Sequence, residues 1–336
     1  MTIQRDRRAP GLAVTDPGRS AGQSLLRQIV GVRELGIVLV IAVAATLLAF
    51  TTPAFLTSQN LSAVAIGLVT DALIAIAMTK VLISGGFDLS VGSVLALAGM
   101  VVADLLHRGL SPLVAIPVTL VVASVVGLVN GLLIAKVKVN PLITTLGMMS
   151  ITSSLTLVIS GGYPVSNLPA DFLFLGQGSL WGVPLAVLLV VGLVAVADVL
   201  LRRARWLRLI YYVGGNERAA LLSGIPVDVV RIAIYVFCSV MAGFAGIIAT
   251  SRLGSAFPLA GRGAEMRVIS ACVIGGSSLQ GGEGTVLGSL LGVLLMAIIN
   301  NGLVLLNVSI NWQGIVSGAI LIAAVTFDML NRRNRS

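Results

Sequence analysis

The chain has 336 residues, of which 57% are hydrophobic and only 10% are charged, and its mean hydropathy is +1.04. Soluble domains carry about 25% charged residues, so this composition excludes an ordinary water-soluble protein. The net charge of +9 comes from basic residues that flank apolar segments rather than forming one stripe. This pattern argues against nucleic-acid binding and fits membrane topology and contact with anionic lipid.

A basic N-terminal tail, residues 1–35, is predicted to be disordered and is followed by about ten apolar windows of membrane-spanning length. Each window is predicted to be helical, because hydrocarbon offers no partner for unpaired backbone amides. The predicted fold is therefore all-α, a polytopic membrane bundle of about ten transmembrane helices over residues 36–330, with a short tail at 331–336. The windows lie near residues 36–52, 61–84, 90–106, 112–135, 141–160, 181–201, 230–251, 267–284, 285–305 and 312–329.

Four basic clusters predict the orientation of the bundle. They lie before the first window, at 136–138, at 202–231 and at 332–335. With an even number of spans all four fall on one side, which the positive-inside rule assigns to the cytoplasm. We therefore expect a multi-pass inner-membrane protein with both termini in the cytoplasm.

Few ionisable residues lie inside the apolar windows. Lys80, Asp104 and Asp198 lie near window ends, where side chains can reach the interface. Only Asp71 lies well within a window, and Lys80 is too far along the helix to pair with it directly. One such carboxylate is weak support for a proton relay, and an ion-coupled secondary carrier stays open as an alternative function.

A glycine-rich break separates the second and third windows, and reads Gly85-Gly86-Phe87-Asp88-Leu89-Ser90-Val91-Gly92-Ser93. A helix that stops here leaves backbone groups in need of partners. Asp88, with Ser90, is predicted to cap the third span, and this structural role is favoured over direct contact with a solute. Ile83–Gly86 is similar to Ile274–Gly276, which we interpret as convergent turn chemistry rather than an inverted repeat.

Polar, uncharged side chains in or beside the windows are candidates for lining a transport pathway. A polar solute that crosses a membrane needs groups that bind briefly and release. The same residue types also bridge membrane helices by hydrogen bonds, so both interpretations stay open. The candidates are Thr144, Thr145, Ser150, Asn300 and Asn301.

Other reactive residue types predict no metal or cofactor site. Cys238 and Cys272 lie inside windows without metal-ligand spacing and are expected to be reduced packing residues. Glu265, which precedes the eighth window, is expected to act as a cap or to pair with Arg262 or Arg267.

The loop between the sixth and seventh windows, about residues 202–230, contains the most informative polar segment. Asn216 is a good helix N-cap, and Glu217 suits the first turn. Ala219–Leu222 favours a helix, which Gly224 can close and Pro226 cannot continue. The sequence predicts a short helix outside the bilayer.

This loop resembles the coupling helix of ABC importer permeases, specifically the ribose-type monosaccharide permeases of the branched-chain amino acid/ribose permease family. Other matches follow in order and cover about residues 36–330. They are the glycine-rich break at 85–93, Asn140–Gly147, Gly263–Met266 with Val273–Leu279 and Gly281–Gly284, Asn300–Leu303 and Trp312–Gln313. The resemblance implies the fold of a type II ABC importer permease.

The resemblance further implies a subunit that is not itself an enzyme, which agrees with the lack of a GxxxxGK[ST] phosphate loop. Expected partners are cytoplasmic ATP-binding subunits, a periplasmic sugar-binding protein and a second permease copy, as a homodimer or a heterodimer with a paralogue. Residues 161–180 and 252–266, with Glu265, are candidates for docking the binding protein. The expected substrate is a monosaccharide such as ribose or xylose, although a related branch carries a furanosyl signalling molecule. The coupling residues implied are Gly215, Asn216, Glu217, Arg218, Ala219, Ala220, Leu221, Ser223 and Gly224, and the signature-turn or gating residues are Gly85, Gly86, Asp88, Ser90 and Gly92.

Overall fold

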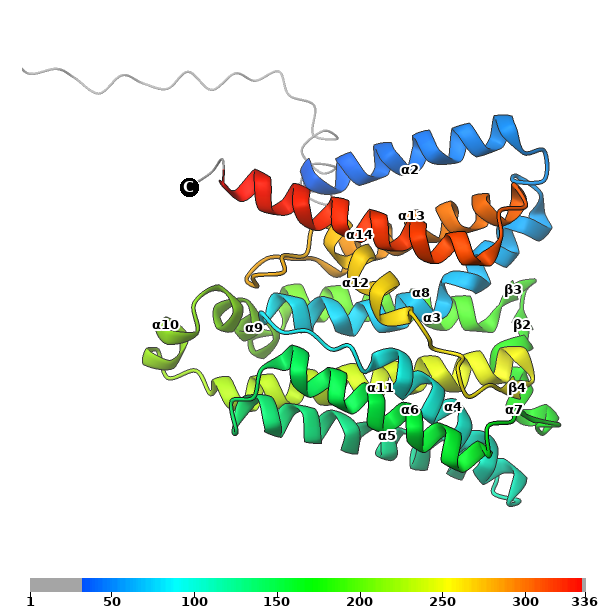
Figure 1. Ribbon diagram of the computed structural model, residues 1–336, viewed down its shortest axis with the longest axis horizontal. Coiled ribbons are helices and arrows are strands. Elements are labelled where there is room, and N and C mark those ends of the chain that lie inside the picture. The colour runs from blue at the N-terminus through cyan, green and yellow to red at the C-terminus, as the bar shows by residue number, and fades with distance from the viewer. Residues whose placement is uncertain (1–31, 334–336) are drawn as a thin grey trace, which may run out of the picture.

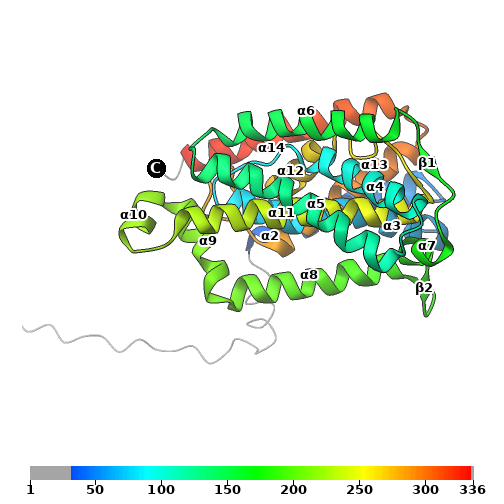
Figure 2. The ribbon, with the colours of Figure 1, turned by 90° about the horizontal axis from the view of Figure 1, so that it is seen from below.

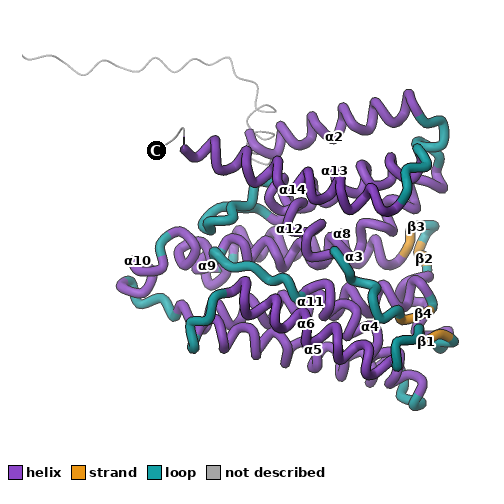
Figure 3. The backbone as a smooth tube through the Cα atoms, in the orientation of Figure 1, coloured by secondary structure: helices purple, strands orange, loops and turns teal. Residues whose placement is uncertain are grey.

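The computed structural model describes residues 32–333, which form a bundle of long helices lying side by side (Figure 1). Helices dominate throughout, and the few short strands lie at the end of the bundle opposite α10 (Figure 3). The helices are α2 (Val32–Thr51), α3 (Ser58–Ile83), α4 (Val91–His107), α5 (Pro112–Ala135), α6 (Pro141–Ser160), α7 (Ala170–Gln177), α8 (Leu185–Arg203), α9 (Arg205–Gly215), α10 (Glu217–Leu222), α11 (Val227–Leu253), α12 (Ala264–Ile274), α13 (Val286–Leu305) and α14 (Ile310–Arg333).

Six helices within residues 32–333 are long and apolar enough to cross a membrane, namely α2, α3, α5, α6, α11 and α13. The pair α8 and α9, bent by 72° at the break between them, would make a seventh, while α4 is apolar but shorter. Every predicted window overlaps a helix in sequence. The all-α membrane bundle is thus confirmed, and the count of about ten spans stays a prediction.

The eighth window was predicted to be helical throughout, and this is wrong after Ile274. Residues 275–285 form turns instead, in which Gly276, Gly281 and Gly282 adopt positive φ angles that favour glycine. The exposed backbone groups find partners within the protein; for example, Ser278 N donates to Glu283 O at 3.0 Å. Non-helical backbone is tolerated here because the surrounding chain satisfies its hydrogen bonds.

Helix α11 lies at the centre of the bundle, packed against α3, α4 and α5 (Figure 2). Its side chains Tyr235, Cys238 and Ala242 are buried, and so is the whole of α3 from Ala72 to Ile83. Cys238 and Cys272 are buried and unbridged. The core of the bundle is therefore built around α11 and the second half of α3.

Two segments predicted to be periplasmic docking regions are paired in the structure. Strand β1 (Val165–Ser166) runs antiparallel to β4 (Ser255–Ala256), with Val165 opposite Ala256. A separate hairpin joins β2 (Ser179–Leu180) to β3 (Val183–Pro184). The Val32 end of α2 and the Arg333 end of α14 lie at the other end of the bundle, with α10 (Figure 1).

Of the predicted tails, residues 1–31 and 334–336 lie outside the described residues. Residues 32–35 already belong to α2, and residues 331–333 continue α14. The helical bundle thus extends slightly beyond both predicted domain boundaries.

Candidate functional site

The short helix predicted between the sixth and seventh windows is present as α10. Asn216 caps it, with its Oδ1 accepting a hydrogen bond from Ala219 N at 2.9 Å. The helix ends at Leu222, followed by Ser223 and by Gly224, whose φ of +78° fits a helix terminus that only glycine tolerates well. Ala220 packs inward, whereas Leu221 is 54% and Leu222 86% exposed. This helix therefore presents apolar side chains at its outer surface.

Helix α9, which leads into α10, is not among the elements predicted from the sequence. Its buried face consists of Ile210 and Val213, with Leu207 and Tyr211 partly buried, and its outer face exposes Trp206. Leu207, Ile210 and Tyr211 recur at the three- and four-residue spacing of an amphipathic helix. This spacing could have predicted α9, but the basic residues Arg205 and Arg208 in the same segment are also typical of a loop.

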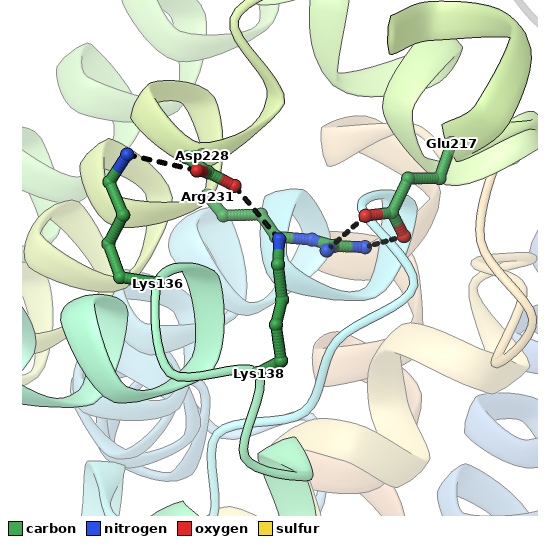
Figure 4. Close-up of polar contacts among 5 residues, drawn as sticks. All are labelled: Lys136, Lys138, Glu217, Asp228 and Arg231. Atoms are coloured by element: carbon green, nitrogen blue, oxygen red, sulfur yellow. Dashed lines mark hydrogen bonds and ion pairs between the residues drawn. The ribbon is translucent and has the colours of Figure 1, made fainter.

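Glu217 in the first turn of α10 forms a two-bond ion pair with Arg231 of α11. Arg231 Nη1 donates to Glu217 Oε1 at 2.8 Å and Nη2 to Oε2 at 2.6 Å. Figure 4 shows the two side chains pointing toward one another across the gap between the helices. Charge-assisted pairs with two parallel bonds fix geometry as well as adding energy. The pair therefore orients α10 on the central helix.

A second set of ion pairs ties α11 to the loop between α5 and α6. Asp228 accepts from Lys136 Nζ and from Lys138 Nζ, each at 3.0 Å, and both lysines reach toward it in Figure 4. In the sequence these two lysines indicate only the orientation of the bundle. In the structure they connect the loop before α6 to α11, the helix to which Glu217 of α10 is bonded.

A cavity of about 270 Å³ lies where these elements meet. It brings together three groups predicted separately: the signature turn, the coupling loop and the loop before α6. Its lining includes Gly85, Gly86, Asn140, Glu217, Arg231 and Tyr235. Gly85 and Glu217, which both line the cavity, are 132 positions apart in the sequence.

In the signature turn, Asp88 is fully buried and its Oδ1 accepts from Ser90 N at 2.9 Å and from Ser90 Oγ at 2.6 Å. Asn130 Nδ2 on α5 donates to the same Ser90 hydroxyl at 3.1 Å. The predicted cap is wrong in detail, because Ser90 at the N-cap position makes no side-chain hydrogen bond to the first turn of α4. Asp88 instead holds Ser90, since a buried carboxylate needs donors close by.

Gly92, the last of the signature-turn residues, packs against a distant part of the chain. It lies in the first turn of α4, and the segment before α12 crosses it at Gly261. A Cβ on either glycine would overlap the other's carbonyl oxygen. The signature turn is therefore in backbone contact with the residues that lead into α12.

The pathway candidates fall into two groups. Thr144 and Thr145 are buried near the start of α6, and Ser150 is exposed on the same helix. Asn300 and Asn301 lie on α13, where the Asn301 amide exchanges two hydrogen bonds with Asn60 of α3, at 3.0 and 2.8 Å. The structure therefore separates the α6 candidates from those on α13.

Asp71, the carboxylate predicted to lie within a span, bonds to Arg267 of α12. Arg267 Nε and Nη2 donate to Asp71 Oδ2 and Oδ1 at 3.1 and 3.2 Å. Glu265 was predicted to act as a cap or to pair with Arg262 or Arg267, and the two hydrogen bonds of the Arg267 guanidinium go to Asp71. The two residues are 196 positions apart, so no local pattern could reveal the pair.

Comparisons with known proteins give one consistent result. The family described as the branched-chain amino acid transport system permease component matches residues 60–325. The chain is 39% identical over 298 residues to the ribose import permease protein of Bacillus subtilis (strain 168), covering 88% of this chain and 92% of that protein. It is 38% identical over 340 residues to the L-arabinose ABC transporter permease protein of Azospirillum brasilense, covering 100% of this chain and 97% of that protein.

The ribose import permease protein of Escherichia coli (strain K12) is also 39% identical over 298 residues, again covering 88% of this chain and 92% of that protein. No solved structure matches the chain. The family model spans the region from α3 to α14, and thus includes α10 and the signature turn. Together with the apolar helices, these matches identify the chain as a multi-pass membrane protein that belongs to the branched-chain amino acid transport system permease component family.

Proposed function

We propose that this chain is the membrane-spanning permease subunit of an ATP-driven importer for a pentose-type monosaccharide. The substrate class is supported by relatives named for ribose and L-arabinose import, which are 38–39% identical over at least 88% of the chain. The observation that carries the proposal is α10: a short capped helix at one end of the bundle, with Leu221 and Leu222 exposed and Glu217 bonded to the central helix.

The partner of α10 is an ATP-binding subunit, which supplies the ATP hydrolysis. Exposed leucines on a helix outside the apolar spans favour burial in a partner's groove. Arg218 and Ala219 are exposed beside them and belong to the same surface. In this proposal the coupling segment is Gly215–Gly224, and the chain itself catalyses no reaction.

The end of the bundle that carries α10 faces the cytoplasm. Lys136, Lys138 and Arg205 gather there, as the positive-inside rule requires of cytoplasmic segments. Both the start of α2 and the end of α14 lie on that side (Figure 1). The opposite end, with β1 paired to β4, then faces the periplasm and receives the sugar-binding protein.

A second permease copy, identical or a paralogue, completes the pathway between the two subunits. Ser150 is exposed on α6, with its hydroxyl bonded to Leu146 O of the same helix, and is proposed to line this pathway. Thr144, Thr145, Asn300 and Asn301 are proposed as further lining residues, and the exposed apolar faces of α2 and α5 as contacts with lipid. The signature turn, beside the cavity that Glu217 also lines, contributes to gating on the cytoplasmic side.

Reconstitution tests this proposal. The chain is placed in liposomes with its ATP-binding subunits, and labelled ribose, L-arabinose or xylose is supplied with the sugar-binding protein outside. We expect uptake of at least one pentose only with all components and ATP. Uptake by the chain alone along an ion gradient would contradict the proposal and favour the secondary carrier.

A further inference from the structure

Three glycine-containing segments, far apart in sequence, meet at the end of the bundle beside α10. They are the end of α3, the last turn of α9 and the turn between α12 and α13. Gly282 N donates a hydrogen bond to Ile83 O at 2.8 Å, which joins the first and third segments directly. We refer to Ile83, Gly85, Gly214, Gly281 and Gly282 as the glycine junction.

The contacts in the glycine junction are made by backbone atoms. A Cβ built on Gly214 would overlap the carbonyl oxygen of Ile83 and lie 2.8 Å from Gly282 N. A Cβ on Gly281 would lie 2.7 Å from Gly214 O and 3.0 Å from Gly85 Cα. Real Cβ atoms do not approach backbone this closely, so a side chain at either position would push the three segments apart.

Gly214 is required for close approach rather than for an unusual conformation. It lies within α9 and does not adopt a positive φ angle. Replacing it with alanine is therefore compatible with the helix itself. Any effect of that change would come from the contact with Ile83 and Gly282.

A side-chain contact reinforces the glycine junction one turn earlier in α9. The Tyr211 hydroxyl donates to Gly284 O at 2.8 Å, so α9 bonds to the turn between α12 and α13 as well as packing on it. Only Asn216 separates α9 from α10. The proposed docking helix is thus one residue from the segment that contacts both α3 and the turn.

When one segment moves, direct backbone contacts such as those in the glycine junction move the neighbouring segment with it. Closely packed protein interiors have low compressibility, whereas exposed lysine and arginine side chains can change rotamer without moving the backbone. Beyond the junction, the Asp71–Arg267 pair joins α3 to α12. Movement of α9 would therefore act on two elements that are already linked to one another.

We propose that the glycine junction transmits the displacement of α10 to α3 and to the turn before α13, which makes Gly214 and Tyr211 positioning residues for coupled transport. This inference rests on the proposed function, because it takes α10 as the helix moved by the ATP-binding subunit. The glycines of the junction act together in this role, although they lie far apart in the sequence.

The test compares Gly214→Ala with Gly192→Ala in the assembled importer. Gly192 is an exposed helical glycine on α8 with no atom near its Cβ position, so it controls for the glycine-to-alanine change itself. Pentose uptake and ATP hydrolysis are measured together in liposomes, with and without sugar-loaded binding protein. For Gly214→Ala we expect the ratio of sugar moved to ATP hydrolysed to fall by about tenfold or more.

A purely structural defect would lower uptake and ATP hydrolysis in parallel and leave their ratio unchanged, which would overturn the inference. If Gly214→Ala does not assemble, Tyr211→Phe carries the test, with the exposed Tyr212→Phe as its control. An unchanged ratio in Tyr211→Phe would then contradict the inference, and a fall confined to Tyr211→Phe would support it. A wild-type importer that moves no pentose would contradict the proposed function, whatever the variants do.

Discussion

Glu217 of α10 and Arg231 of α11 are joined by two hydrogen bonds, at 2.8 and 2.6 Å, between a surface helix and the central helix of the bundle. Arg231 is 19% and Glu217 39% exposed, so water screens the pair only in part. A partner that pushes on α10 must carry the start of α11 with it or break this pair. This side-chain pair ties α10 to α11, whereas the backbone contact at Gly214 ties α9 to the end of α3.

Removing the guanidinium by Arg231→Ala should loosen α10 without unfolding the bundle. Two charge-assisted bonds at a partly exposed position are worth about 1 kcal/mol. We expect less sugar moved per ATP hydrolysed, measured in the reconstituted importer. The exchange Glu217→Arg with Arg231→Glu should restore part of the ratio, and a double variant no better than the single would argue against this role of the pair.

Ala220→Pro should abolish transport while leaving membrane insertion intact. Ala220 N donates the first hydrogen bond of α10 to Asn216 O at 2.9 Å, and proline both removes this donor and clashes with that carbonyl, at a cost of about 3 kcal/mol. Ala220→Ser keeps the donor and is the control. Insertion is followed by the amount of protein in the membrane fraction, and normal uptake by Ala220→Pro would exclude α10 as the coupling helix.

Asp71→Asn should destabilise the protein more than the double change Asp71→Asn with Arg267→Gln. The single change leaves a guanidinium among apolar helices without its carboxylate, which costs about 2 kcal/mol after allowing for partial exposure. Thermal unfolding in detergent measures the difference. Equal midpoints for the single and double variants would show that Arg267 does not depend on Asp71.

Asp228→Asn should have a small effect on stability, because its two lysine partners are 58% and 57% exposed. Exposed pairs contribute about 0–1 kcal/mol and weaken with salt. We expect a thermal midpoint close to that of the wild type, with any difference vanishing at high ionic strength. A large loss of stability that persists in salt would instead make the loop between α5 and α6 part of the rigid core.

The sequence was sufficient wherever the determinant is local. Helices follow from apolar windows, because a helix in a bilayer satisfies its own backbone hydrogen bonds, and α10 follows from the Asn216 cap and the Gly224 terminus. The boundaries of α5 and α6 agree with their predicted windows to the residue, and a proline at the first position marks where each helix begins.

Long-range contacts could not be predicted in the same way. Asp71 pairs with Arg267, and Gly282 bonds to Ile83, across about 200 positions with no local pattern to mark them. The resemblance between the glycine turns at 83–86 and 274–276 was visible in the sequence. That the chain from Ile83 to Gly85 meets the turn following Ile274 became evident only from the fold, because contact depends on how α3 and α12 pack.

The most direct test of the account is photo-crosslinking from the outer surface of α10. Leu222, 86% exposed, is replaced by p-benzoyl-phenylalanine, and Val158 on α6, 77% exposed, serves as the control position. In the assembled importer we predict a crosslink to the ATP-binding subunit from position 222 and none from position 158. No crosslink from position 222, in a complex that still imports pentose with ATP, would contradict the assignment of α10 as the contact that drives transport.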